Sequence, residues 1–243
     1  MRVLVIGDNC IDEFVYGACK RICPEAPVPV FNPIKTVQNR GMAGNVVANL
    51  ENHIEVDFVT NPEKIVKSRY VDEDSNQMIV RIDANDRCKR ISREELHAVN
   101  YNKYEAIVIS DYDKGFLDQE DIRYIASRHP LTFLDTKKKL GDWCESISYI
   151  KINEDEYERT KFTISKAVEE NLIVTRGGAG CEYRGEIYPV NKVEVKDVSG
   201  AGDTFLSALV YNFINSYVIE DAIKFANERA SEVIQKRGVN VWT

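Results

Sequence analysis

The sequence predicts an α/β fold in which helices cover both faces of a mostly parallel sheet. From residue 92 onwards, short aliphatic runs alternate with segments that carry one apolar stripe at helical spacing. Such alternation is typical of parallel strands that are joined by helices. The aliphatic runs are nearly unbroken, as in Val3-Leu4-Val5-Ile6, which is expected when a strand is buried on both faces.

Length and composition favour a single domain that spans residues 1–243. The chain has 243 residues, of which 44% are hydrophobic, and this suits a single α/β domain with an appendage. The net charge of −7 argues against a nucleic-acid partner. No apolar run resembles a secretory leader or approaches the length of a membrane span, and the six cysteines lack the spacing of a zinc site. We therefore expect a cytoplasmic protein that binds neither nucleic acid nor membrane.

Before residue 92 the sequence predicts one buried strand and a small antiparallel sheet. The buried strand covers residues 2–6. The other strands alternate in polarity or are interrupted by proline, which suits an edge or a lid; they are expected at 13–17, 28–37, 67–71 and 77–83. The glycine-rich turn from Arg40 to Asn45 leads into a helix over 46–50, and a weak strand follows at 56–60. This turn either lets a ligand approach the backbone or is a plain helix entry.

The rest of the chain predicts regular units of strand and helix. Ser92 and Glu95 form a capping box that starts the first helix. Strands are expected at 105–110, 131–134, 147–152 and 172–174, followed by a hairpin of 181–184 and 187–190. Further helices, each recognised by its apolar stripe or its starting residue, are expected at 117–128, 153–160, 165–169, 200–215 and 219–236.

Five predicted strands each end on a polar residue, namely Asp8, Asp111, Asp135, Asn153 and Thr175. In open α/β sheets, ligands bind beyond the carboxyl ends of the strands. The glycine-rich loops at 177–180 and 200–202 fall on the same edge. This edge therefore carries the kinds of group that bind phosphates and a metal. Each aspartate taken alone could instead be a polar strand end without a functional role.

The stretch from Asp197 to Thr204 predicts the reacting centre. Gly200-Ala201-Gly202 precedes a helix, so unpaired N–H groups and the helix dipole form an anion-binding site. A carboxylate beside such a site makes sense if it takes a proton from a hydroxyl that attacks the bound anion, and Asp203 is placed to do so. The alternative is a glycine-rich turn in which Asp203 only stabilises the helix start.

No Walker-A or dinucleotide-binding motif is present. Instead, Asp197 to Asp203 resembles the D-[TS]-x-G-A-G-D signature of the ribokinase (PfkB) family of sugar kinases. Arg21 to Val30 and Ser110 to Gly115 resemble "R-I-S-P-E-A-P-V-P-V" and "S-D-Y-G-K-G" of its heptose 7-phosphate kinases, and two further stretches, Gln77 to Asp83 and Leu134 to Lys137, agree. The resemblance spans nearly the whole chain. It implies a ribokinase-like three-layer α/β/α sandwich with a mostly parallel central sheet and a small antiparallel β lid, formed by segments near 13–37 and 67–83.

The resemblance also implies ATP-dependent transfer of the γ-phosphoryl group to a hydroxyl of a sugar or sugar phosphate, with heptose 7-phosphate as the expected acceptor. Asp203 would be the base, and Gly200, Ala201 and Gly202 would present N–H groups to the phosphoryl group. Mg²⁺ would be held, mainly through water, by Asn153 and Glu156. Those two residues also match the nucleotide site, together with Thr175, Gly177, Gly180, Asn227 and Lys137. The residues matching the acceptor site are Asp12, Gly41, Asn45, Asp111 and Lys114.

Several features leave alternatives open. Lys114 and Lys137 either belong to the site or are ordinary solvated lysines. Arg69 and Arg81 either contact a sugar phosphate or lie on a solvent-exposed face. Met42 replaces a second glycine of the family and would narrow or reshape the sugar pocket, and the chain is shorter than its relatives at two places. A non-catalytic sugar-phosphate-binding relative and a kinase for another sugar therefore remain alternatives. The lid strands carry apolar faces that nothing in the chain covers, so we expect a homodimer formed through the lids.

Overall fold

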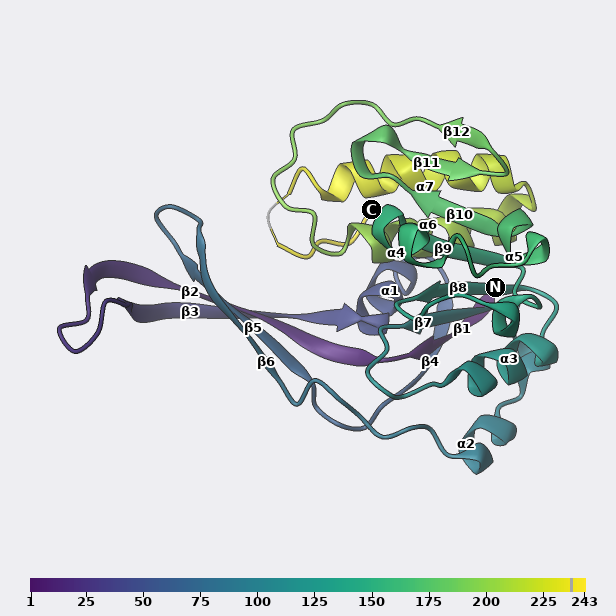
Figure 1. Cartoon of the computed structure of the whole chain (residues 1–243), viewed down its shortest axis with the longest axis horizontal. Helices are drawn as coiled ribbons and strands as arrows, with labels where there is room; N and C mark the ends of the chain where they lie inside the picture. Colours follow the sequence, from purple (N-terminus) through teal and green to yellow (C-terminus); the bar gives the residue numbers. More distant parts are fainter. Residues whose placement is uncertain (237) are drawn as a thin grey trace.

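An eight-stranded sheet forms the body of the protein, and a four-stranded sheet projects from it (Figure 1). This computed structural model describes residues 1–236 and 238–243. The body strands lie in the order β12-β11-β10-β9-β8-β7-β1-β4. Their bounds are β1 (Arg2–Gly7), β4 (Glu55–Thr60), β7 (Ala106–Asp111), β8 (Thr132–Thr136), β9 (Tyr149–Asn153), β10 (Leu172–Thr175), β11 (Cys181–Tyr183) and β12 (Glu186–Tyr188).

The body sheet is mostly parallel, as predicted. Successive pairings from β4 through β1, β7, β8 and β9 to β10 are parallel, and the hairpin of β11 and β12 adds antiparallel strands at one edge. Side chains of a strand alternate between the two faces of the sheet. In β1, Val3 and Val5 belong to one hydrophobic cluster, and Leu4 and Ile6 belong to the other. The unbroken aliphatic runs are thus explained by burial on both faces.

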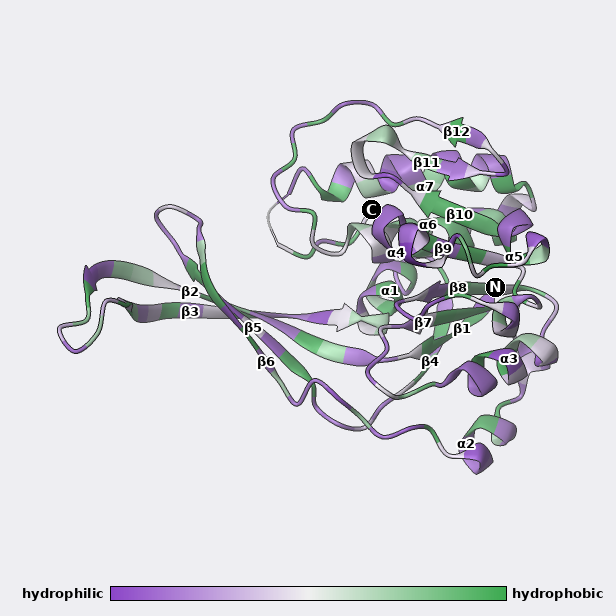
Figure 2. Cartoon of the chain, viewed as in Figure 1, coloured by the Kyte–Doolittle hydropathy of each residue, from purple (hydrophilic) through white to green (hydrophobic). Residues whose placement is uncertain are grey.

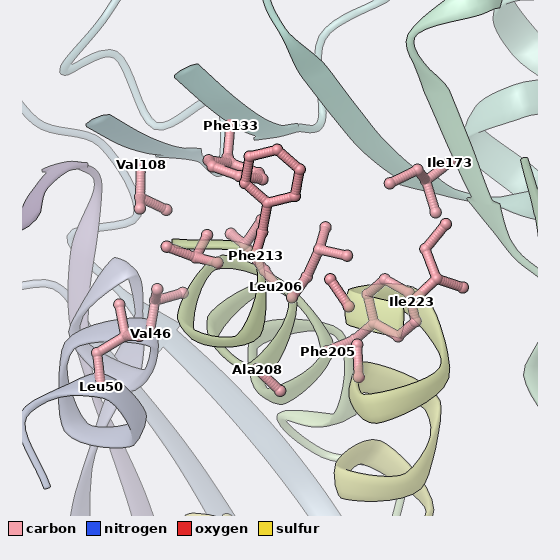
Figure 3. Close-up of a cluster of buried hydrophobic side chains, with 14 of the residues drawn as sticks. Val46, Leu50, Val108, Phe133, Ile173, Phe205, Leu206, Ala208, Phe213 and Ile223 are labelled. Atoms are coloured by element: carbon pink, nitrogen blue, oxygen red, sulfur yellow. The ribbon is translucent and has the colours of Figure 1, made fainter. Parts of the chain in front are cut away.

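Helices cover both faces of this sheet and give three layers. On one face pack α1 (Ala43–Leu50), α6 (Ala201–Ser216) and α7 (Ile219–Val233). The opposite face is covered by α2 (Arg93–Ala98), α3 (Gln119–Arg128), α4 (Glu154–Thr160) and α5 (Lys166–Glu170). Short 3₁₀ turns are η1 (Tyr101–Lys103), η2 (Asp142–Cys144) and η3 (Gly177–Ala179). Figure 3 shows Phe213 of α6 pointing toward Phe133 of β8 in the first interface.

The projecting sheet, called the lid from here on, consists of β3 (Pro29–Met42), β2 (Asn9–Ile22), β5 (Val66–Asp72) and β6 (Met78–Ala84), in that order. β2 and β3 are longer than expected and extend well away from the body (Figure 1). The lid differs from the expectation in one respect, because β2 and β5 in its centre pair in parallel, while the two outer pairs are antiparallel. The chain passes through α1 and β4 between β3 and β5, and this crossover returns it in the direction of β2.

Most expected boundaries agree with the structure to within two residues. The largest differences at helix ends are at α1, which begins at Ala43 instead of residue 46, and at α7, which ends at Val233 instead of residue 236. The early start of α1 places Asn45 inside the helix, where its side chain is held in a fixed direction. None of the helices in the described part of the chain has the length and apolar content needed to cross a bilayer.

Candidate active site

The amino terminus of α6 lies at the carboxyl edge of the body sheet. The helix begins directly after Gly200, whose φ of 80° lies in the left-handed region. A Cβ at this position would lie 2.7 Å from Asn45 Nδ2, so glycine is required. The N–H of Ala201 donates to the Val198 carbonyl oxygen (3.2 Å), whereas the N–H groups of Gly202 and Asp203 have no acceptor within the helix. This helix end can therefore bind an anion, mainly through Gly202 and Asp203.

Asp203 is held at this helix end by two hydrogen bonds. Its Oδ1 accepts a bond from the Tyr112 hydroxyl (2.6 Å), and its Oδ2 accepts one from Asn45 Nδ2 (2.9 Å). Burial raises the pKa of Asp203 from its ordinary value of 3.8 to about 6, against the opposite effect of the two hydrogen bonds. A buried carboxylate that titrates this close to neutral pH is well matched to general-base catalysis.

A cavity of about 340 Å³ lies between the lid and the body, beside Asp203. Its lining includes two carboxylates, Asp12 and Asp203, and five cationic side chains, namely Lys67, Arg69, Arg81, Lys114 and Lys137. Four of the cations also contact carboxylates outside the lining. Lys67 lies 3.0 Å from Asp83 Oδ2, Arg81 lies 2.7 Å from Asp83 Oδ1, Lys114 lies 2.5 Å from Asp86 Oδ2, and Lys137 lies 2.5 Å from Glu156 Oε1. The cations outnumber the carboxylates of the lining, so this cavity suits an anionic ligand.

A second cavity, of about 470 Å³, lies on the other side of the α6 amino terminus. Ala201 and Gly202 form its floor near the helix end, and most of its remaining wall is apolar, including Val193, Phe205 and Ile234. Four residues expected at the nucleotide line this cavity, namely Thr175, Gly177, Gly180 and Asn227. An apolar slot that ends at backbone N–H groups suits a nucleotide, with the base in the slot and the phosphates at the helix end.

Two ion pairs, formed by residues of β8, the loop after it, β9 and α4, lie near Asp203. Lys151 Nζ lies 2.7 Å from Asp135 Oδ2, and Lys137 Nζ lies 2.5 Å from Glu156 Oε1. Burial acts to lower the pKa of Lys137, but Asp135 and Glu156 hold it above its ordinary value, so this ammonium group stays charged. With Asp203 ionised, the two ion pairs and Asp203 together hold three carboxylates and two ammonium groups, which favours a further cation at this place.

The residues expected at Mg²⁺ suit a metal that is held through water. Asn153 and Glu156 form the capping box of α4: Asn153 Oδ1 accepts from the Glu156 N–H (2.9 Å), and Glu156 Oε2 accepts from the Asn153 N–H (2.8 Å). Among the described residues, no three His, Cys, Asp or Glu side chains are arranged to hold a metal ion. Buried Asp135 Oδ1 has no hydrogen-bond partner and is available to an ordered water. Mg²⁺ usually keeps several waters and binds one or two carboxylates together with substrate phosphates, so these residues fit it.

The structure brings most of the expected residues to the two cavities. Asp12, Asn45, Lys114, Gly200 and Asp203 line the first cavity, and so does Lys137, which was expected at the nucleotide. Gly41 stands behind Asp12, where a Cβ would lie 2.3 Å from Asp12 Oδ2. Asp111 does not line either cavity, because its carboxylate accepts hydrogen bonds from Thr136 Oγ1 and Lys138 Nζ and is fully covered.

Met42 lies in the wall of the first cavity and has an unusual backbone conformation. Its φ of 53° and ψ of −135° belong to a region that side-chain-bearing residues rarely adopt, and such strain costs about 1–3 kcal/mol. The side chain is 3% exposed and packs against Cys10 and Ile65. Met42 therefore occupies space at the edge of this cavity, where a glycine would adopt the same backbone without strain and leave more room.

Tyr112 is a functional candidate that the sequence did not single out. It lies within the Ser110 to Gly115 stretch, so the motif itself was a signal, but its hydroxyl contact with Asp203 depends on the loop that Asp8 fixes. Asp8 is fully buried and accepts bonds from the N–H groups of Tyr112 (2.7 Å), Phe116 (3.2 Å) and Lys114 (3.3 Å). The polar end of β1 therefore has a structural role, which is to present the Tyr112 loop to the site.

Replacing Tyr112 by phenylalanine is expected to move the acid limb of the kcat/KM profile to higher pH. The hydrogen bond from Tyr112 favours the ionised form of Asp203, so its loss raises the pKa of that carboxyl. The expected rise is about 1 pH unit, which corresponds to the usual contribution of a hydrogen bond to a charged group. Activity requires the ionised base and would be lost earlier as the pH falls. A pH series of phosphoryl-transfer rates checks this, and an unchanged acid limb would show that Tyr112 does not tune the base.

Comparison with known proteins gives a consistent picture. The model of the "pfkB family carbohydrate kinase" matches residues 50–242. Two relatives called "Bifunctional protein HldE", from a Nitratiruptor species and from Helicobacter hepaticus, are each 30% identical over 100% of this chain and over 63% and 62% of their own length. The chain thus spans a little under two thirds of these relatives. A ribokinase from Thermotoga maritima (TM-score 0.70, 16% identity, 98% of this chain and 94% of that chain) and a ribokinase from Arabidopsis thaliana complexed with ribose and ATP (TM-score 0.68, 16% identity, 97% and 93%) share the fold.

Proposed function

Because the chain belongs to the pfkB family of carbohydrate kinases, we propose that it transfers the γ-phosphoryl group of ATP to a hydroxyl of a sugar phosphate. The proposed acceptor is heptose 7-phosphate and the product heptose 1,7-bisphosphate, in line with the resemblance of residues 21–30 and 110–115 to heptose 7-phosphate kinases. The observation that carries the proposal is the position of Asp203, whose pKa is about 6, at a helix end between a nucleotide-sized apolar cavity and a cation-lined cavity.

In the proposed mechanism, Asp203 accepts the proton of the acceptor hydroxyl as that oxygen attacks the phosphoryl group. The N–H groups of Gly202 and Asp203 bind the oxygens of the phosphoryl group, so that its charge is stabilised by donors already in place. Lys137 supplies a fixed positive charge in the same region. Mg²⁺, when bound, would neutralise charge on the nucleotide phosphates, and we assign its water-mediated contacts to Glu156 and Asn153. The protein therefore acts by positioning and charge compensation.

The cation-lined first cavity, which we assign to the acceptor and call the acceptor cavity, supports a phosphorylated acceptor over a neutral sugar. Five cations line it, and Arg69 alone is paired closely with a lining carboxylate, Asp12 Oδ1 at 2.5 Å. The other four are paired with Asp83, Asp86 or Glu156 outside the lining, and these ion pairs hold the cationic N–H groups in place at the cavity wall. A phosphate group on the acceptor would receive charge-assisted hydrogen bonds from the lid cations, which are stronger than bonds between neutral groups.

An assay of ADP release with purified protein tests the proposal. Heptose 7-phosphate is expected to be turned over faster than fructose 6-phosphate, and ribose is expected to react slowest because it carries no phosphate for the lid cations. Turnover confined to another sugar would reassign the substrate. No turnover with any of the three, together with retained ligand binding, would overturn the kinase proposal in favour of a non-catalytic sugar-phosphate-binding relative, the alternative that the bulk and strain of Met42 favour.

We further propose that two copies associate through their lids. Hydrophobic residues occur along the strands of the lid (Figure 2). Several of the large ones are exposed, including Ile34 (63% exposed), Ile82 (49%) and Val80 (47%). An exposed apolar sheet with free edges is unfavourable in water, and pairing with a second copy removes it. Light scattering at micromolar concentration is expected to give the mass of a dimer, and a lysine at Ile82 should shift the distribution toward monomer. A monomeric wild-type protein at this concentration would contradict the proposal.

We propose a cytoplasmic location as well. All six cysteines are free, which suits a reducing compartment, and a kinase needs the ATP available there. The acidic net charge gives no reason to expect nucleic acid as a partner. Fractionation of cells that express the protein checks this, and recovery in the membrane fraction or outside the cell would contradict it.

A further inference from the structure

Asn49 is a fully buried asparagine that none of the functional motifs includes. It lies in α1, four residues after Asn45, and is 0% exposed. Its Nδ2 donates to Asn45 Oδ1 (3.2 Å) and to the Asn45 carbonyl oxygen (2.8 Å). Its Oδ1 accepts from the main-chain N–H of Trp242 (3.2 Å) and, at 3.4 Å, from the hydroxyl of Thr204, the residue that follows Asp203. The amide of Asn49 therefore bonds to Asn45, which contacts Asp203, to Thr204, which follows Asp203, and to Trp242.

The two ends of this hydrogen-bonded chain fix the orientation of both amides. The main-chain N–H of Trp242 is only a donor, so the oxygen of Asn49 must face it. The ionised carboxylate of Asp203 is only an acceptor, so the nitrogen of Asn45 must face Oδ2. Between them, Asn49 Nδ2 faces Asn45 Oδ1, which is the one arrangement that satisfies both amides. Without Asn49, the Asn45 amide would lose the partner that keeps its nitrogen toward Asp203.

The segment that carries Trp242 is itself packed into the site. The Trp242 side chain is 3% exposed, its ring stacks on His53 with centroids 3.7 Å apart, and its Nε1 lies 3.4 Å from Ser207 Oγ on α6. Val239 of the same segment lines the acceptor cavity. The position of this segment is thus connected, through Asn49 and Asn45, to the carboxylate of Asp203.

We propose that Asn49 is a positioning residue for the phosphoryl-transfer reaction, holding the Asn45 amide toward Asp203 and linking the base to the Trp242 segment. This proposal deepens the proposed function and rests on Asp203 being the base. Asn49 touches neither cavity, so it acts through Asn45 and not on the substrate. Its loss is expected to raise the pKa of Asp203, because a hydrogen bond that favours the ionised form is weakened.

The other groups around Asp203 are not bonded to Asn49, so we expect them to stay in place when Asn49 is changed. Five titratable or charged groups face Asp203. They are Cys10 of the lid, Tyr112 of the loop after β7, Asp135 of β8, Lys137 of the loop after β8 and Lys151 of β9. None of them hydrogen-bonds to Asn49. A shift in the titration of Asp203 on changing Asn49 therefore reports on the Asn45 contact.

The test compares Asn49→Leu, which has similar volume but no amide, with Asn49→Ser, which is smaller and guards against misfolding of the first variant. Carbon-13 NMR of labelled aspartate side chains, with the Asp203 signal assigned through Asp203→Asn, gives the pKa without requiring turnover. In both variants this pKa is expected to rise by about 1 pH unit, and the acid limb of kcat/KM is expected to move equally. Asn52→Leu is the matched control, because Asn52 is exposed and its side chain hydrogen-bonds to the Ala48 carbonyl oxygen (3.4 Å).

The outcomes separate this inference from the proposed function. An unchanged Asp203 pKa in a folded Asn49 variant overturns the positioning role, whether or not the protein turns over a sugar. A raised pKa in the Asn49 variants with an unchanged value in Asn52→Leu supports it. If the wild type shows no turnover, the proposed function fails, and the NMR titration still decides whether Asn49 orients the Asn45 amide.

Discussion

Asp203→Asn is expected to lower kcat by about 10²–10⁴-fold, the usual contribution of a general base. Asparagine keeps the shape of the side chain and can still bond to Tyr112 and Asn45, but it cannot take the proton of the acceptor hydroxyl. KM for both substrates should change little, because the cation-lined cavity and the apolar cavity remain intact. Steady-state rates of ADP formation check this result. A variant with wild-type kcat would rule out Asp203 as the base.

The same variant gives an independent control through its stability. The pKa of Asp203 is raised from 3.8 to about 6, so the folded state favours the protonated carboxyl, and the wild type loses stability as the pH rises from about 4 to about 6. Asp203→Asn lacks this loss. Its free energy of unfolding at pH 8 is expected to exceed that of the wild type by up to about 3 kcal/mol, and the difference should vanish below pH 4. Denaturant titrations at the two pH values measure it, and they also show whether the inactive variant is folded.

Lys114→Met is expected to reduce kcat/KM for heptose 7-phosphate by about 10–150-fold, which corresponds to the loss of one charged hydrogen bond. Lys114 lines the proposed acceptor cavity, and its ammonium group is held by Asp86 at 2.5 Å, so it is already positioned to contact a phosphate. The effect should fall mainly on KM, because this contact does not involve the reacting oxygen. For ribose, which carries no phosphate, kcat/KM should change far less. Parallel kinetics with the two acceptors provide the measurement.

Lys89→Met is the matched control for this prediction. Lys89 is an exposed lysine that lines neither the proposed acceptor cavity nor the proposed nucleotide cavity, and its removal changes the net charge by the same amount. Equal losses for both acceptors in Lys114→Met would mean that Lys114 does not bind the acceptor phosphate. Equal losses in Lys114→Met and Lys89→Met would mean that only the overall charge matters.

The fold could be predicted from the sequence because its signals are local. The uninterrupted run from Val3 to Ile6 requires burial on both faces, and the Ser92–Glu95 capping box marks a helix start that the structure reproduces at Arg93. Both features are decided by neighbouring residues. The parallel pairing of β2 with β5 was not predicted, because strand direction depends on the crossover through α1 and β4 and not on the strands themselves.

The part of the candidate site that could be predicted consists of residues at the ends of strands or in glycine-rich loops. Asp203, Thr175 and the loop at 177–180 were found in this way, since the carboxyl ends of parallel strands meet at one edge. The contacts of Tyr112 and Asn49 with this centre were not predicted, because they join residues more than 90 positions apart through a loop and a helix face. Asp111 shows the converse case: it lies at a strand end, yet Lys138 and Thr136 cover its carboxylate.

The central claim is that the protein phosphorylates a sugar phosphate with Asp203 as the base, and phosphorus NMR of a single reaction tests it most directly. Purified protein with ATP, Mg²⁺ and heptose 7-phosphate is expected to give a second sugar phosphate resonance that grows in step with ADP, and Asp203→Asn under the same conditions is expected to give almost none. Loss of ATP without a new sugar phosphate signal, or equal product from wild type and Asp203→Asn, would contradict the claim.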